Sequence, residues 1–330
     1  MSLVNDAIRP FWINGLNEIT GKQSGSFSKW IIDGNYQIYT NIKSEFFTLK
    51  IDPSISSRNS LLKAFAFDCN RMASASFESI QLISKSELFP KSTAWSVIQS
   101  YYSAFFAAHS ILRMFGISCS QLDSVAINKV VEIANLFEKN PAGVNIKNGY
   151  YKCRYDYTTH QLCCSPLASG GGSHENFWKT FYNEFKKISS NILSASLIPD
   201  ADAQKVSGQI DAMCCNLSRN GMNGGNWLSH IRNKVNYQHE FDCWFPYQNT
   251  TKRSVSELYE TSQTWLIDPM HISLTATRDI LLFHRTCNFI VSLCRTLIEY
   301  MSDRCPEGKT RSYLADGSIK LLKLSRQSLN

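Results

Sequence analysis

Beyond residue 60, hydrophobic and polar positions mostly alternate with the three- and four-residue spacing of buried helix faces. Residues 61–89 predict one long helix. Residues 92–116 predict a second helix, which begins near Ser92 or Thr93 and ends at Gly116. Hydrophobic side chains surround this second helix almost completely, so we expect it at the centre of a helical bundle.

Helical spacing returns in several later segments, which polar stretches separate. The segments are residues 126–140, 175–193, 201–219 and 271–301. A further helix is expected to begin after Asn226, because asparagine is a favoured N-cap residue. Together with the two earlier helices, these segments predict a mainly α protein.

The first 58 residues show a different pattern. Residues 29–51 are rich in β-branched and aromatic side chains, and Asp33 followed by Gly34 is a common turn signal. We therefore expect a short hairpin or small sheet before the bundle. Residues 149–164, with closely spaced tyrosines and cysteines, predict an extended or looped segment.

These patterns give an expected organisation for the whole chain. A small β-rich extension covers residues 1–58, and a helical bundle covers residues 59–302. A segment at about residues 117–173 is inserted into the bundle, and residues 303–330 form a polar C-terminal tail that is partly mobile. A chain of 330 residues is long enough to bury a substantial core.

Composition narrows the class of protein. The chain is 43% hydrophobic and 18% charged, which is typical of a folded globular protein. It has neither a hydrophobic run near the ~18 residues of a membrane span nor an N-terminal signal pattern, so we expect a cytoplasmic protein without a membrane partner. Eleven cysteines, an odd number, favour reduced thiols. The net charge of +7 permits a polyanionic partner but does not require one.

The candidate chemistry lies in residues 230–241, His-Ile-Arg-Asn-Lys-Val-Asn-Tyr-Gln-His-Glu-Phe. Arg232, Asn236 and His239 are spaced i, i+4 and i+7, so a helix would present them on one face, with His239 close to the helix end. Asn233 and Tyr237 flank them. An apolar stripe of Leu228, Ile231 and Val235 lies beside this polar face.

These side chains suit the cleavage of RNA. Imidazole can donate or accept a proton near neutral pH, and guanidinium matches the oxygens of a phosphate. The 2′-hydroxyl of RNA supplies the nucleophile, so the reaction needs neither a metal cofactor nor a nucleophile from the protein. The alternative is the ordinary polar face of a surface helix, because Arg and His at this spacing are common.

Two motifs resemble those of HEPN-domain proteins, the higher eukaryote and prokaryote nucleotide-binding family. Residues 94–117 resemble the family's Tyr-Tyr-Ala-Met-Phe-His-Ala-Ala helix. The matching residues are Tyr101, Tyr102, Phe105 or Phe106, Ala107, Ala108, Leu112 and Gly116. The later sequence Arg-Asn-Lys-Val-Asn-Tyr-Gln-His resembles the family's arginine–polar–histidine motif, with Arg232, Asn233 and His239 at its three positions.

The resemblance implies an up-down bundle of four or five helices and a homodimer. The motifs of two subunits would face each other and form one composite endoribonuclease site, with Arg232 and His239 catalytic and Asn233 supporting them. Asn236 is added from helix geometry, and Tyr237 from its position beside the motif, as supporting or RNA-binding residues. The family includes toxins and anti-phage effectors, so an antitoxin or another regulatory partner protein is expected. Phe241 replaces the tyrosine that some of these toxins carry as a modification site.

Other interpretations remain open. The chain could be a non-catalytic HEPN-like module for dimerisation or binding, or a nucleotide sensor. His109, on the most hydrophobic helix, could support the site or could be a buried core histidine. A zinc site built from Cys153, His160, Cys163 and Cys164 is conceivable, but this spacing matches no paired Cys-x-x-Cys motif. The more economical interpretation of that cluster is reduced structural thiols.

Overall fold

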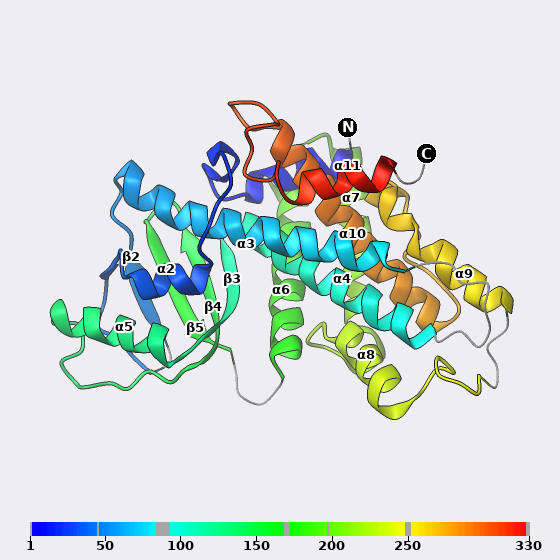
Figure 1. Ribbon diagram of the computed structural model, residues 1–330, viewed down its shortest axis with the longest axis horizontal. Coiled ribbons are helices and arrows are strands. Elements are labelled where there is room, and N and C mark those ends of the chain that lie inside the picture. The colour runs from blue at the N-terminus through cyan, green and yellow to red at the C-terminus, as the bar shows by residue number, and fades with distance from the viewer. Residues whose placement is uncertain are drawn as a thin grey trace.

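The computed structural model describes residues 2–44, 46–83, 93–167, 172–196, 198–247 and 252–327. The protein is mainly helical and has one antiparallel sheet, as expected from the sequence. The sheet lies at one end of the molecule and most of the helices lie toward the other, with α6 (Ser173–Ser194) between them, while the long helix α3 (Ile55–Gln81) begins near the sheet and runs across the molecule (Figure 1). No helix in the described ranges has the length and hydrophobicity to cross a membrane.

Most helices follow the predicted segments. Their bounds are α1 Leu3–Ile8, α2 Phe27–Asp33, α3 Ile55–Gln81, α4 Thr93–Met114, α5 Ser124–Leu136, α6 Ser173–Ser194, α7 Asp200–Leu217, α8 Trp227–Gln238, α9 Lys252–Ser262, α10 Asp279–Asp303 and α11 Ser318–Gln327. Short 3-10 turns are η1 Arg9–Phe11, η2 Leu16–Glu18, η3 Arg219–Gly221, η4 Thr264–Leu266 and η5 Pro269–His271. The last long helix therefore begins later than its predicted start at residue 271. Thr93 begins α4, whereas Ser92 lies outside the described residues.

The sheet combines the N-terminal extension with the inserted segment. Its strands are β1 Gln37–Ile38, β2 Phe47–Lys50, β3 Ile117–Leu122, β4 Gly149–Asp156 and β5 Gln161–Pro166, in the order β1-β2-β5-β4-β3. The predicted extended segment is the β4–β5 hairpin, and Leu49 of β2 pairs with Leu162 of β5. Residues 1–58 are thus bound to residues 117–173 by backbone hydrogen bonds.

The hairpin predicted within residues 29–51 is present as the antiparallel pair of β1 and β2, but Asp33 and Gly34 do not form its turn. Residues 27–33 form α2, and Gly34 ends this helix in the left-handed conformation with φ of 72°. The hydroxyl of Ser26 caps the helix by accepting a hydrogen bond from the backbone N–H of Lys29. Phe27, Trp30 and Ile31 are buried, so tertiary packing outweighs their strand propensity.

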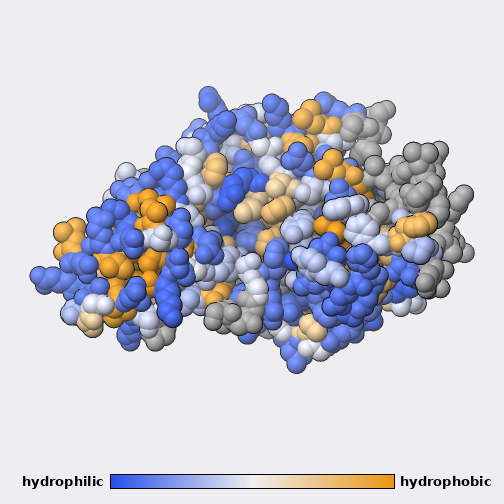
Figure 2. Space-filling view, turned by 60° about the horizontal axis from the view of Figure 1, so that its bottom comes forward, coloured by the Kyte–Doolittle hydropathy of each residue, from blue (hydrophilic) through white to orange (hydrophobic). Residues whose placement is uncertain are grey.

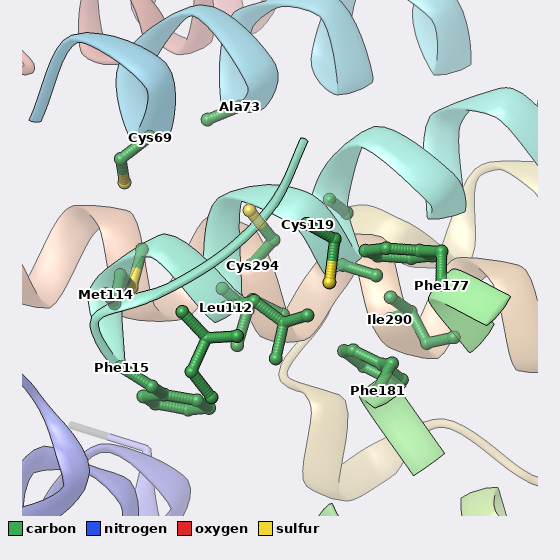
Figure 3. Close-up of a cluster of buried hydrophobic side chains, with 14 of the residues drawn as sticks. Cys69, Ala73, Leu112, Met114, Phe115, Cys119, Phe177, Phe181, Ile290 and Cys294 are labelled. Carbon is green, nitrogen blue, oxygen red and sulfur yellow. The ribbon is translucent and has the colours of Figure 1, made fainter. Parts of the chain in front are cut away.

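The long helices α3 and α4 run side by side, and α10 packs against α4 (Figure 1). The hydrophobic core continues from these helices to α6 and β3. Figure 3 shows Leu112 and Phe115 at the end of α4, Phe177 and Phe181 of α6, and Ile290 of α10 within this cluster. The core thereby fixes α4 and α6 relative to each other.

A buried ion pair joins α3 to α4. Nε of Arg113 lies 3.7 Å from Oδ2 of Asp68, and both side chains are 1–2% exposed. The same guanidinium donates to the backbone carbonyl of Ile117 at the start of β3, with 3.2 Å between the atoms. One buried arginine therefore connects both helices to the sheet.

The C-terminal residues, expected to form a polar tail that is partly mobile, are packed against the rest of the protein. Tyr313 and Leu314 are buried, and α11 packs against α3. The side-chain amide of Asn70 on α3 donates to the carbonyl of Tyr313, and its oxygen accepts from the backbone N–H of Ser318. Hydrophobic positions 319 and 322 of the tail face the core, which explains why a mostly polar sequence stays packed.

Candidate functional site

Helix α8 carries the arginine–histidine motif and is fixed by its apolar stripe. Asn226 is its N-cap residue, as expected, although the side chain makes no capping hydrogen bond. Leu228, Ile231 and Val235 are buried, which confirms the predicted stripe. Arg232 is buried as well, at 8% exposure, because its side chain turns toward α4 rather than toward solvent.

Arg232 lies against the two tyrosines of the α4 motif. Its guanidinium carbon is 5.0 Å from the ring centroid of Tyr101 and 5.9 Å from that of Tyr102. Its Nε has no hydrogen-bond partner, and within the described residues no carboxylate lies in ion-pair range of the guanidinium. The two motifs, 131 positions apart between Tyr101 and Arg232, thus meet around one buried cation.

Tyr101 is the centre of a hydrogen-bond network. Its side chain is fully buried, and its oxygen accepts from Nε1–H of Trp178 at 3.0 Å. The same oxygen lies 2.9 Å from Nδ1 of His174, at the beginning of α6. Burial raises the pKa of Tyr101, whereas the neighbouring Trp178 donor and the positive charge of Arg232 oppose that shift.

His174 was not identified from the sequence. It is half-buried, and its ring centroid lies 5.7 Å from that of Tyr101 and 4.4 Å from that of Phe105. Burial, and secondly the charge of Arg232, lower the pKa of His174 to about 4. The imidazole is therefore neutral at pH 7. One signal in the sequence could have identified it. His174 is in the first turn of a helix, and Trp178 follows four residues later, so both side chains project from the same helix face.

His109 is buried in the hydrophobic core. Its ring stacks on Phe177 with 3.8 Å between centroids, and it is 4% exposed. Burial is the largest cause that holds its pKa well below the ordinary value, followed by the charge of Arg113. Phe105 contacts both His109 and His174, so His109 borders the cluster from inside the core rather than from the solvent side.

The remaining motif residues lie toward solvent. Asn233 and Tyr237 are exposed, Tyr237 to 71%, and Asn236 is half-buried. His239 is the C-cap residue of α8, with φ of 55°, and it is exposed. Its ring centroid lies 5.6 Å from that of Trp244. The side chain has therefore left the helix face that carries Arg232 and Asn236.

The surface around this helix is mostly hydrophilic. Figure 2 views the molecule from the side on which α8 comes forward. Hydrophilic residues dominate there, and hydrophobic residues gather instead over the sheet and α5. On or next to α5, Val125, Leu136 and Phe137 are exposed. The face that carries the motif is thus suited to a polar ligand.

The cysteine–histidine cluster does not converge on one point. Cys153 and Cys164 are paired across neighbouring strands and buried, whereas Cys163 is exposed on the other face of the sheet. His160 is in the hairpin turn, where Nδ1 lies 3.3 Å from the hydroxyl of Tyr155. Among the residues that the structure describes, no three His, Cys, Asp or Glu side chains are grouped as a metal site.

The arrangement as a whole combines a buried guanidinium, a neutral imidazole and a tyrosine hydroxyl, with a second imidazole exposed at the end of the same helix as the arginine. Such a set can bind an oxyanion and move a proton. Comparison of the chain with protein-family models, curated proteins and solved structures finds no match.

Proposed function

We propose that the protein is a metal-independent endoribonuclease of the HEPN type, which acts as a homodimer with a composite site. The observation that supports this most is the buried Arg232 guanidinium without a carboxylate partner among the described residues. A buried cation is costly unless an anion or hydrogen-bond acceptors compensate it. A phosphate of RNA would supply both, because its oxygens match the guanidinium.

The chemistry needs few groups. The 2′-oxygen of the substrate attacks phosphorus, its proton passes to a base, and the bond from phosphorus to the 5′-oxygen breaks. The products are a 2′,3′-cyclic phosphate and a 5′-hydroxyl, which takes up a proton. In this proposal Arg232 neutralises the charge that grows on the phosphate oxygens, and His239 is the general acid or base.

The other motif residues have supporting roles in this proposal. Asn233, exposed in the middle of α8, contacts the substrate or orients His239, and the exposed ring of Tyr237 stacks on an RNA base. Asn236 lies on the helix face of Arg232 and hydrogen-bonds to the same phosphate. The biological role is that of a cytoplasmic toxin or anti-phage effector that a partner protein holds inactive.

Incubation of purified protein with total RNA and with a matched DNA tests the proposal. Wild-type protein should cut only RNA, in the presence of EDTA, and leave cyclic phosphate ends. Arg232→Ala and His239→Ala should each lose at least about 100-fold in rate, within the range for removing one acid–base or charge-stabilising group. His230→Ala, on the same helix, is the matched control. Cleavage by both active-site variants at the wild-type rate, or its loss in EDTA, contradicts the proposal.

A second candidate is binding without cleavage, in a dimerisation or nucleotide-sensing module. The observation that favours it is the position of His239, which packs beside Trp244 beyond the end of α8. About 10 Å of helix axis separates positions 232 and 239, so one subunit need not bring the two side chains to one phosphate. RNA that binds in a polarisation assay and stays intact would favour this candidate.

A further inference from the structure

Three of the side chains around Tyr101 carry nitrogen atoms that can form hydrogen bonds. The guanidinium carbon of Arg232 is 5.0 Å from the tyrosine ring centroid, and Nε1–H of Trp178 donates to the tyrosine oxygen. The third is His174, whose Nδ1 is 2.9 Å from that oxygen. Of these, Trp178 supports the network from within the core, whereas His174 is half-buried and reaches the boundary with solvent.

The donors around Tyr101 favour one position for the proton on His174. Indole and guanidinium can only donate, and both Trp178 and Arg232 face the oxygen of Tyr101. The tyrosine proton can then go to Nδ1 of His174, 2.9 Å from the oxygen, or to the hydroxyl of Ser229, and the site inferred below uses the first arrangement. A neutral imidazole that accepts at Nδ1 carries its hydrogen on Nε2. This Nε2–H is left available as a donor, since the structure gives it no partner within the described residues.

The beginning of α6 adds backbone donors at the same place. Gly172 is the N-cap residue and provides no capping side chain. The first helical hydrogen bond runs from the N–H of Asn176 to the carbonyl of Gly172, so the N–H groups of residues 173–175 precede it. The N-terminal end of a 22-residue helix also carries partial positive charge. Glu175 is the acidic residue of this first turn, and its exposed side chain can turn to solvent.

We propose that Arg232, His174 and the first turn of α6 form a phosphate-binding site within one subunit, in which His174 donates through Nε2–H to the bound oxyanion. Arg232 fulfils the electrostatic requirement, since it is 8% exposed and its Nε is unpartnered. Tyr101 positions both side chains, one through its ring and the other through its hydroxyl. The assignment of this site to the scissile phosphate of RNA rests on the proposed function. The assignment as a phosphate-binding site does not depend on it.

The proposal makes His174 a contact to the anion rather than part of the core. His109 provides the contrast, because its ring is stacked on Phe177 and offers no face to solvent. Arg232 and His174 are 58 positions apart in sequence and lie on different helices, so no single helix motif would contain both. The site also needs no second copy of the chain, whereas the arginine–histidine motif alone implies one.

Two binding probes test this site. One is inorganic phosphate, and the other is a 2′-O-methyl RNA tetranucleotide that cannot be cleaved. Calorimetry at pH 7 on the full chain should give affinities that fall at least about tenfold in His174→Ala and in Arg232→Gln. His230→Ala should bind both probes like wild type. Nitrogen NMR of labelled histidine should show that Nε2 of His174, but not that of His230, shifts on addition of phosphate.

The outcomes separate the two proposals. Wild-type affinity of a folded His174→Ala variant for both probes, or an unshifted His174 resonance at saturating phosphate, overturns the site. If RNA is never cleaved but phosphate affinity depends on Arg232 and His174, the phosphate site is supported and the proposed ribonuclease activity is wrong. Melting temperatures show whether each variant is folded. His174→Gln retains a hydrogen-bond donor, so it should bind phosphate more tightly than His174→Ala.

Discussion

The hydroxyl oxygen of Tyr101 lies 2.9 Å from Nδ1 of His174, and this contact joins two helices that are 73 positions apart in sequence. The same oxygen accepts from Nε1–H of Trp178, four residues after His174 on α6. The ring of Tyr101 packs beneath the guanidinium of Arg232 on α8. A single buried tyrosine therefore sets the relative positions of groups from three helices.

Tyr101→Phe should destabilise the protein while leaving its shape unchanged. The variant deprives the buried Nε1–H of Trp178 of its acceptor, which costs about 1–3 kcal/mol in the free energy of unfolding. It also frees the His174 ring to rotate, so phosphate affinity should fall. Urea denaturation and calorimetry measure the two effects. Tyr102→Phe is the matched control, because the neighbouring hydroxyl has no described hydrogen bond; an equal loss in both variants would argue against the network.

The sequence predicted the parts of the site that lie on one helix. The apolar stripe of Leu228, Ile231 and Val235 has the spacing of a buried face, and the structure buries all three. It did not identify His174, because a contact between α4 and α6 depends on how two helices pack and leaves no periodic signal. The arginine was also expected on the exposed polar face, whereas its long side chain reaches back to aromatic rings on α4.

The fold shows the same division. Helices with clear 3.6-residue spacing, such as α6 and α7, appear where expected. Residues 29–33 were included in the predicted hairpin of residues 29–51 because their composition favours strands, yet burial of one face makes them part of α2. The pairing of β2 with β5 joins residues more than 110 positions apart, and local sequence contains no information on such a distant partner.

The buried pair of Asp68 and Arg113 should be among the most sensitive positions in the fold. Asp68→Asn leaves the guanidinium of Arg113, which is 1% exposed, without a compensating charge. Removing one partner of a buried pair costs about 3–5 kcal/mol, and here the link from α4 to the start of β3 depends on the same arginine. Lys29→Ala breaks the exposed pair with Asp33 and should change the free energy by less than about 1 kcal/mol. Urea denaturation of both variants checks the contrast.

Acid should destabilise the protein through its buried histidines. Burial lowers the pKa of His284 to about 4, against 6.5 in an unfolded chain. Between these values the unfolded chain binds a proton that the folded protein does not, so this stabilisation is complete above pH 6.5 and is lost as the pH falls toward 4. From pH 7 to pH 5 the loss from His284 is about 2 kcal/mol. The pKa values of His109 and His174 are lowered in the same direction.

Urea denaturation at both pH values measures this dependence. In His284→Gln the difference in unfolding free energy between pH 7 and pH 5 should shrink by about 2 kcal/mol, whatever the variant's absolute stability. The exposed His271 is the matched control, and His271→Gln should retain the wild-type difference. A difference that His284→Gln leaves unchanged would mean that this histidine is protonated equally in the folded and unfolded protein.

Two glycines before α8 test whether the start of this helix positions Arg232. Gly221 and Gly225 both have φ of 78°, so alanine at either position costs about 1–2 kcal/mol in backbone strain. A Cβ at Gly221 meets no atom within 4 Å, whereas one at Gly225 would lie 2.4 Å from Cβ of Tyr182 on α6. Gly225→Ala should therefore cost about 1–3 kcal/mol more in the free energy of unfolding, since α6 and the start of α8 must separate.

The separation of α6 from α8 moves Arg232 away from His174, so phosphate affinity should fall in Gly225→Ala and remain at the wild-type value in Gly221→Ala. Equal phosphate affinities in the two folded variants would show that the spacing of α6 and α8 does not control the site.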